Sequence, residues 1–239
     1  MPDIPNTRRL LAEGRHVTIV ALGDSNTQVS FQTQGRMNWT GLLEEALVET
    51  YGLSCCTFIN SGRYGSTFVE AKNRLYPEVL RFSPDLVIVA LGMNDALAGL
   101  SWLDEFVRHA EDVVSAILAF GEVEVLLRTP NPAINTHALP ANAGKPFQAK
   151  DLDPPGRPLR AYSQALVELA KKMSLPVVDH YSLWEKAIFK DRSDGTAKLL
   201  WQRMGDSMHV NAQGHLAFFR ELAPIFGVPQ TLPWEEMDL

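Results

Sequence analysis

The stretch VTIVALGDSN, residues 17–26, joins an apolar run rich in β-branched residues to four residues that are poor at staying in a sheet. The run predicts a strand buried on both faces, because its apolar residues are continuous rather than alternating. The polar end, Gly-Asp-Ser-Asn at 23–26, has two interpretations. It caps a helix, or it displays a nucleophilic serine at the edge of a sheet. Residues elsewhere in the chain distinguish the two.

Strand-like and helix-like segments alternate along the 239 residues of the chain. The patterns predict strands at 17–22, 55–60, 85–91, 122–129 and 176–179, and helices at 37–51, 66–81, 103–120, 159–173 and 212–226. Such alternation predicts one α/β domain over 1–239, with a five-stranded, mostly parallel sheet covered by helices on both faces. Residues 1–16 are expected to be an N-terminal extension.

Composition and charge exclude several classes of function. The net charge is −6 and the basic residues are scattered, which argues against a nucleic-acid partner or an anionic membrane surface. No apolar run approaches the roughly 18 residues needed to cross a bilayer, and the N-terminus lacks the apolar core of a secretory signal. Cys55 and Cys56 are adjacent in a predicted strand and are expected to be reduced packing residues. We therefore expect a cytoplasmic protein, unless a leader was removed, and the sequence leaves a homo-oligomer open.

One segment breaks the alternation of strands and helices. Residues 129–158, TPNPAINTHALPANAGKPFQAKDLDPPGRP, contain seven prolines. Long irregular loops in compact domains usually carry function or are disordered, and this one follows the carboxyl end of a predicted strand. We expect it to lie over the functional site.

Three further polar or glycine-containing stretches lie at or near the ends of predicted elements. NSGRYGST at 60–67 follows the second strand, LGMNDAL at 91–97 follows the third, and GDSMHVNAQGH at 205–215 precedes the last helix. In a parallel sheet the carboxyl ends of the strands lie along one edge. These stretches and the GDSN segment are therefore expected to meet in one pocket.

The side chains in these stretches are chemically complementary. Ser25 can act as a nucleophile only if a base removes its proton. His209 is the candidate base, and Asp206, three residues earlier, can orient its imidazole and stabilise the charged form. An attacked ester develops negative charge on its carbonyl oxygen, which preorganised N–H donors must meet. The candidate donors are the backbone N–H groups of Ser25 and Gly62 and the side-chain amide of Asn94.

Together these segments resemble, in order and spacing, the four sequence blocks of the SGNH hydrolases, also called GDSL-type. They are Gly-Asp-Ser at 23–25, Gly62 in NSGRYGST, Gly92-x-Asn94-Asp95, and Asp206-x-x-His209. The resemblance extends from residue 17 to about residue 220. It departs from the older GDSL consensus at Asn26, where that consensus has leucine.

The resemblance implies a three-layer α/β/α domain with a flavodoxin-like sheet, and the hydrolysis of esters. It implies that Ser25 is the nucleophile and also donates its N–H to the oxyanion hole. Gly62 and Asn94 are implied as the other donors, His209 as the base and Asp206 as its partner. Asp24 and Asp95 are expected to support this site.

Other polar residues have simpler interpretations. Asn211 is expected to cap the last helix. Asp206, His209 and His215 could suggest a metal site, but no His-x-x-x-His or Cys-x-x-Cys spacing accompanies them, so we expect no metal and no cofactor. The remaining histidines are expected to be surface or core residues: His16, His109, His137, His180 and His215.

The sequence thus predicts a serine esterase that hydrolyses small acyl esters through an acyl-enzyme on Ser25. Short-chain substrates are favoured, including acetylated carbohydrates, for which Trp102, Trp184 or Trp201 could supply a stacking wall. The alternative is a fatty-acyl thioesterase or lysophospholipase. A non-catalytic carbohydrate-binding relative is a hypothesis of a different class, and it would be expected to lack a catalytic residue.

Overall fold

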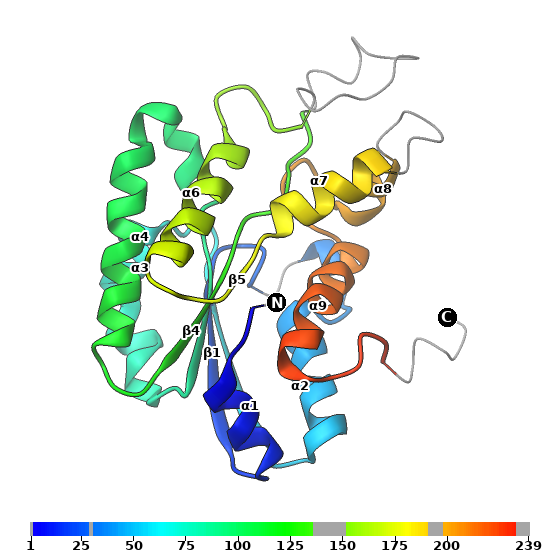
Figure 1. Ribbon diagram of the computed structural model, residues 1–239. Coiled ribbons are helices and arrows are strands. Elements are labelled where there is room, and N and C mark those ends of the chain that lie inside the picture. The colour runs from blue at the N-terminus through cyan, green and yellow to red at the C-terminus, as the bar shows by residue number, and fades with distance from the viewer. Residues whose placement is uncertain (1, 29–30, 136–151, 191–197, 233–239) are drawn as a thin grey trace.

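A parallel sheet forms the centre of the molecule, in a computed structural model that describes residues 2–28, 31–135, 152–190 and 198–232. Its five strands lie in the order β2-β1-β3-β4-β5, and all neighbours run parallel (Figure 1). The strands are β1 (Val17–Gly23), β2 (Cys56–Gly62), β3 (Leu86–Ala90), β4 (Glu124–Arg128) and β5 (Val177–Val178). This order confirms the flavodoxin-like α/β sheet.

Helices cover both faces of this sheet. The α-helices are α1 (Pro5–Ala12), α2 (Trp39–Tyr51), α3 (Phe68–Glu78), α4 (Leu103–Leu118), α6 (Leu159–Lys172), α7 (His180–Lys190), α8 (Lys198–Arg203) and α9 (Ala212–Phe226). Short 3₁₀ turns are η1 (Phe31–Thr33), η2 (Leu80–Phe82), η3 (Asp95–Ala98) and η4 (Leu100–Trp102). No helix in the described ranges is long and apolar enough to cross a membrane.

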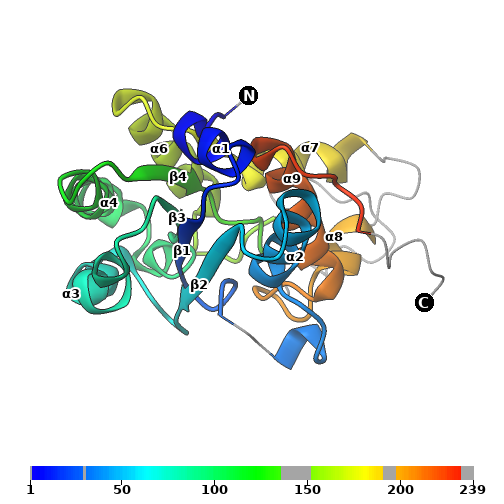
Figure 2. The same ribbon diagram turned by 90° about the horizontal axis from the view of Figure 1, so that it is seen from below.

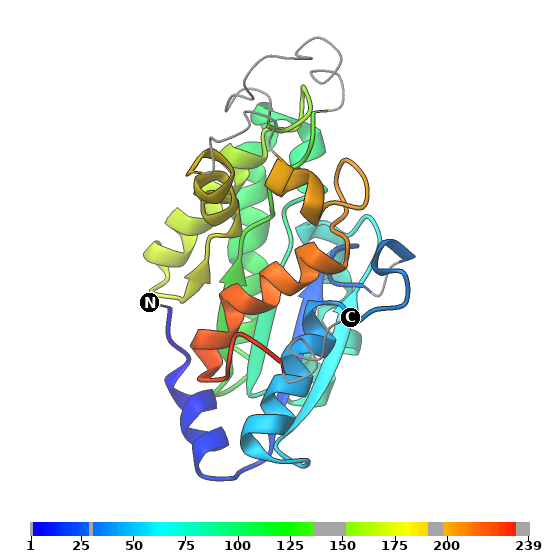
Figure 3. The same ribbon diagram turned by 90° about the vertical axis from the view of Figure 1, so that its right-hand side faces the viewer.

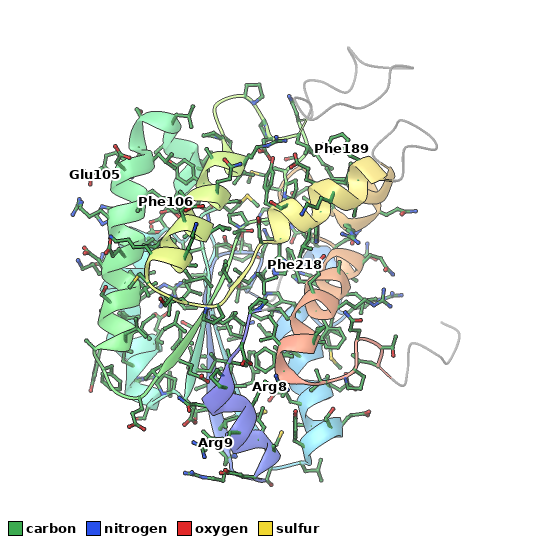
Figure 4. The ribbon with its side chains drawn as sticks, viewed as in Figure 1. Arg8, Arg9, Glu105, Phe106, Phe189 and Phe218 are labelled. Atoms are coloured by element: carbon green, nitrogen blue, oxygen red, sulfur yellow. The ribbon has the colours of Figure 1, made fainter. Side chains whose placement is uncertain are left out.

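The three layers enclose two hydrophobic cores, one on each face of the sheet. Helices α3, α4 and α6 pack on one face, and α2 and α9 pack on the other, as the end-on view of Figure 2 shows. Figure 3 shows α9 and α2 in front of the strands. In Figure 4, Phe106 points from α4 toward the sheet while Glu105 points outward, and Phe106 is fully buried. A sheet buried on both faces explains why the central strands are apolar at consecutive positions.

The predicted elements agree with the structure to within a few residues. The last helix begins and ends where the sequence predicted, and the Asn211 side chain accepts a hydrogen bond from the N–H of Gly214, as expected of an N-cap. The predicted helix at 66–81 is shorter. It begins after a capping box formed by Thr67 and Glu70, and it ends one residue after Pro77.

The N-terminal segment contains a helix that the sequence did not predict. Residues 5–12 form α1, whose Leu10 and Leu11 are buried in the core beside α2 and α9. Its first N–H groups, those of Asn6 and Thr7, donate to the carboxylate of Glu124 on β4. Because this carboxylate is 117 residues or more away in sequence, the local pattern could not reveal the cap.

Cys55 and Cys56 are free thiols, as expected. Cys55 is buried and lies 3.7 Å from Cys56, sulfur to sulfur. Burial and the neighbouring Cys55 raise the pKa of Cys56 to about 12, so the Cys56 thiol stays protonated at physiological pH.

His215 is a fully buried histidine in α9. Its Nδ1 accepts a hydrogen bond from the N–H of Trp39 (3.4 Å), and its Nε2 has no partner among the described residues. Burial, together with the positive charge of Arg128, lowers the pKa of His215 to about 3. Protonation of Nδ1 would also break the bond to Trp39. The folded protein therefore holds this ring neutral.

This buried ring predicts a loss of stability in acid. The pKa of an unfolded histidine is about 6.5, so below that value the unfolded chain binds a proton that the folded chain excludes. The stabilising contribution is complete above pH 6.5 and is lost as the pH falls toward 3. In the His215→Asn variant the amide oxygen can still accept a hydrogen bond from Trp39. As the pH falls, its free energy of unfolding should decline less steeply than that of the wild type, and the two slopes should differ by about 1 kcal/mol per pH unit. Urea melts of both proteins between pH 7 and pH 4.5 measure this, and parallel curves would contradict it.

Candidate active site

Ser25 lies in a tight turn directly after β1, at the carboxyl edge of the sheet. The carbonyl of Asp24 accepts the N–H groups of Thr27 and Gln28, both at 3.0 Å, and the Asp24 side chain accepts the N–H of Asn26 at 2.9 Å. Among the described residues that follow, the first α-helix is α2, whose cap is Asn38. The helix-capping interpretation of residues 24–26 is therefore wrong, and the turn instead displays Ser25.

A chain of hydrogen bonds joins three of the expected residues. Nε2 of His209 lies 3.0 Å from Oγ of Ser25, and Nδ1 of His209 lies 2.7 Å from Oδ2 of Asp206. Ser25 is 4% exposed, whereas the side chains of His209 and Asp206 are 21% and 44% exposed. The chain therefore leads from a buried hydroxyl to a carboxylate at the surface, across 184 residues of sequence.

Asp206 is held as a carboxylate by its surroundings. Partial burial would raise its pKa, but hydrogen bonds from the N–H groups of His209 and Met208 and from the imidazole of His209 outweigh this effect and lower the pKa. Gln32 donates a further bond to Oδ2 at 3.1 Å. An ionised Asp206 places the imidazole proton on Nδ1 and leaves Nε2 free to accept the Ser25 proton. The arrangement can activate a serine nucleophile.

Two of the three expected oxyanion donors are free to bind a ligand. The backbone N–H of Ser25 makes no hydrogen bond with any described residue. One N–H of the Asn94 amide donates to the carbonyl of Ser66 at 3.1 Å, which fixes the amide and leaves its second N–H without a described partner. Both groups follow strands that are neighbours in the sheet.

Gly62 does not match the donor role expected of it. Its N–H donates to Oδ1 of Asn60 at 2.9 Å, so the bond is made within the chain. A side chain at this position would collide with the turn after Ser25, because a Cβ would lie 2.3 Å from the backbone nitrogen of Gln28. The structure thus explains the glycine by close packing of two backbones rather than by a free donor.

Gly65, in the same NSGRYGST stretch, has the properties expected of a donor. Its N–H has no partner among the described residues, and it precedes Ser66, whose carbonyl binds Asn94. Its φ of +71° favours glycine. The sequence pattern did not single it out, because two glycines lie three residues apart and only the fold shows which N–H is already bonded.

Buried Arg74 of α3 ties this loop to the nucleophile strand. Its guanidinium donates to the carbonyl of Gly23, the carbonyl and hydroxyl of Ser61, the hydroxyl of Ser66, and the carboxylate of Glu78, over 2.8–3.0 Å. The ends of β1 and β2 are thereby fixed relative to the loop that bears Gly65. Sequence reasoning missed Arg74, which lies among the buried positions of an amphipathic helix.

Asp24 and Asp95 are buried carboxyl groups next in sequence to Ser25 and Asn94. Burial raises the pKa of each to about 6, although hydrogen bonds from the N–H of Asn26 to Asp24 and from the N–H of Phe68 to Asp95 act in the opposite direction. Phe68 is the first residue of α3. Asp24 therefore shapes the turn of Ser25, and Asp95 anchors the helix that carries Arg74.

The first part of the Pro-rich segment contacts the His209 loop, while residues 136–151 lie outside the described part of the chain. The N–H of Ile134 donates to the carbonyl of Ser207 at 2.8 Å. The N–H of Asp153 donates to the carbonyl of Ala133, and the N–H of Ala133 donates to the Asp153 carboxylate. That carboxylate also accepts the hydroxyl of Tyr181 at 2.7 Å. The two ends of the segment are therefore joined to each other beside the site.

The three candidate tryptophans for a stacking wall have different surroundings. Trp184 is fully buried in the core, where it stacks on Phe218 and donates to Glu221, so it cannot contact a substrate. Trp102, at the end of η4, is 42% exposed. The side chain of Trp201 lies outside the described residues.

Known proteins share sequence similarity with this chain. A family model for the GDSL-like lipase/acylhydrolase family matches residues 21–217. The GDSL esterase/lipase CPRD49 of Arabidopsis thaliana is 26% identical over 210 residues, which are 82% of this chain and 73% of that protein.

Solved structures share the fold. The acetyl xylan esterase AlAXEase has a TM-score of 0.67 at 19% identity, over 86% of this chain and 98% of that one. Axe2, an acetylxylan esterase from Geobacillus stearothermophilus, has a TM-score of 0.67 at 17% identity, over 91% of this chain and 97% of that one.

Proposed function

The chain belongs to the GDSL-like lipase/acylhydrolase family and is a hydrolase of ester bonds, and we propose that it acts as a serine esterase on short-chain acyl esters. The observation that carries this proposal is the hydrogen-bonded chain from Ser25 through His209 to Asp206 at the carboxyl edge of the sheet. The nucleophile, the base and the carboxylate that orients the base are all present. This completeness argues against a non-catalytic carbohydrate-binding relative.

The reaction begins when Nε2 of His209 takes the proton of Ser25 as Oγ attacks the ester carbonyl. Negative charge then moves to the carbonyl oxygen, where the N–H groups of Ser25 and Gly65 and the amide of Asn94 stabilise it. Gly65 takes the place that the sequence suggested for Gly62. Each such donor contributes on the order of 10²–10³ in rate.

The tetrahedral intermediate collapses when the C–O bond to the alcohol breaks. His209, now protonated, donates its proton to the leaving oxygen, and the acyl group remains on Oγ of Ser25. His209 then takes a proton from water, which attacks the acyl carbonyl and releases the carboxylic acid. Ser25 recovers its proton from His209, so the enzyme returns to its starting state.

The structural neighbours support the proposal of a short acyl group, because they include two acetylxylan esterases. Because their identity to this chain is low, we take from them a testable substrate class: acetyl esters of carbohydrates. Trp102 is an exposed aromatic surface, placed a few residues after Asn94, and could stack on a sugar ring.

A series of p-nitrophenyl esters from C2 to C12 tests this class. We expect kcat/KM to be highest for the acetate or propionate and at least about tenfold lower for the octanoate, because a pocket that fits acetate excludes added methylenes. Release of acetate from acetylated xylo-oligosaccharides should accompany this profile. The Ser25→Ala variant measures the background hydrolysis of each ester. A maximum at C8–C12 would contradict the deacetylase assignment and favour a lysophospholipase or fatty-acyl thioesterase.

A further inference from the structure

Asn26, the residue after the candidate nucleophile, bonds to both sides of the candidate base. Its Nδ2 donates to the carbonyl of Met208 at 3.3 Å, and its Oδ1 accepts the N–H of Val210 at 3.1 Å. Met208 and Val210 flank His209 in sequence. A single planar amide therefore holds the backbone before and after the imidazole.

Asn26 is itself fixed to the end of the nucleophile strand. Its N–H donates to Oδ1 of Asp24 at 2.9 Å, and the residue is 6% exposed. The N–H of Asp24 in turn donates to the carbonyl of Ala90 at the end of β3. The position of the amide is thus set by the sheet, and a movement of the His209 backbone would break bonds to a rigid partner.

The segment that carries His209 has little regular structure of its own. Between α8 and α9 its pairing consists of one isolated bridge, Met204 to Val210, within the described residues. Bonds within the segment join the N–H groups of Gly205 and Asp206 to the carbonyl of His209, and the N–H of His209 to the Asp206 carboxylate. Its ties to more distant parts of the chain include those from Gln32 to Asp206 and from Ile134 to Ser207, which lie before the histidine. Besides the bond between Ser25 and His209, Asn26 is the described link from the nucleophile turn to this segment.

We propose that Asn26 is a positioning residue, which sets the distance between His209 and Ser25 by clamping the backbone on both sides of the histidine. The proposal rests on the serine esterase function proposed above. Proton transfer depends steeply on the alignment of donor and acceptor, and a displacement of about 1 Å can cost about 10²-fold in rate. Asn26 thereby gives a reason for the departure from leucine in the GDSN segment.

Asn26→Leu removes both hydrogen bonds while nearly preserving the volume of the buried side chain. We expect kcat for p-nitrophenyl acetate to fall about 10- to 100-fold with KM little changed, because the ester still binds but the base is misplaced. The decisive readout is a double-mutant cycle with His209→Ala. In the His209→Ala background, the same change at Asn26 should lower kcat/KM by less than about threefold, because no base remains to be positioned.

Tyr51→Phe is the control for lost stability. Tyr51 is the last residue of α2, and its hydroxyl donates to the carbonyl of Phe226 at 2.8 Å, away from the Ser25 turn. We expect its melting temperature to fall while kcat stays nearly unchanged. If Asn26→Leu does not fold, Asn26→Asp replaces it in the cycle. That variant keeps the acceptor for Val210 and loses the donor to Met208.

The outcomes separate this role from the function on which it rests. Equal losses of kcat/KM in the wild-type and His209→Ala backgrounds, or full activity of Asn26→Leu, would overturn the positioning role while the esterase function stands. A wild-type protein that hydrolyses none of the esters would overturn the proposed function and the role of Asn26 with it.

Discussion

Ser25→Ala is expected to lower kcat/KM for p-nitrophenyl acetate by about 10⁴- to 10⁶-fold. The hydroxyl of Ser25 is the nucleophile in the proposed reaction, and alanine leaves no atom that can form the acyl-enzyme. The fold should be unaffected, since the side chain is small and its recorded partner is His209. Initial rates of p-nitrophenolate release, with melting temperature measured alongside, give the result.

Ser163→Ala is the matched control for this change. Ser163 is a buried serine of α6, 2% exposed, whose hydroxyl has no partner among the described residues. Its removal should leave the rate unchanged. If Ser25→Ala kept more than about one hundredth of the wild-type rate, the hydrolysis would have to use another nucleophile.

His209→Ala is expected to cost about as much as the loss of Ser25, again about 10⁴- to 10⁶-fold in kcat/KM. Without the imidazole nothing accepts the Ser25 proton during attack, and nothing protonates the leaving alcohol. The two residues act as one unit, so the Ser25→Ala, His209→Ala double variant should be no slower than either single variant. The same assay measures all three proteins.

His16→Ala supplies a control for the removal of an imidazole. His16 immediately precedes β1, and it contacts Ser54 and Thr57 near the beginning of β2, at the opposite end of the sheet from Ser25. It should retain the wild-type rate. Independent, multiplying losses at Ser25 and His209 would show that the two side chains do not share one proton-transfer step.

The five strands, five of the α-helices and the meeting of distant polar segments could be predicted, because they follow from local patterns and from the parallel sheet. The helices α1, α7 and α8 were not predicted. Continuous apolar strands such as 85–91 are typical of sheets covered on both faces, and β3 is buried at every position. The carboxyl ends of such strands share one edge, where Ser25 and Asn94 lie. The loop between α8 and α9 brings Asp206 and His209 to Ser25, as expected.

The remaining features depend on partners that are remote in sequence. Gly62 and Gly65 differ in whether their N–H is already bonded, and that depends on the side chain of Asn60. Trp184 was one of three candidates for a sugar-stacking wall, but its stacking on Phe218 places it in the core. Asn26 could be read as a cap, because its partners lie 182 and 184 residues away.

Covalent labelling of Ser25 tests the account most directly. The intact protein is treated with a fluorophosphonate, its residual esterase activity is followed, and the modified peptide is identified by mass spectrometry. We predict one adduct per chain, located on Ser25, formed in step with the loss of hydrolysis of p-nitrophenyl acetate and absent from Ser25→Ala. Undiminished hydrolysis after complete labelling of Ser25, or loss of activity through an adduct on a different residue, would contradict a mechanism that passes through an acyl group on Ser25.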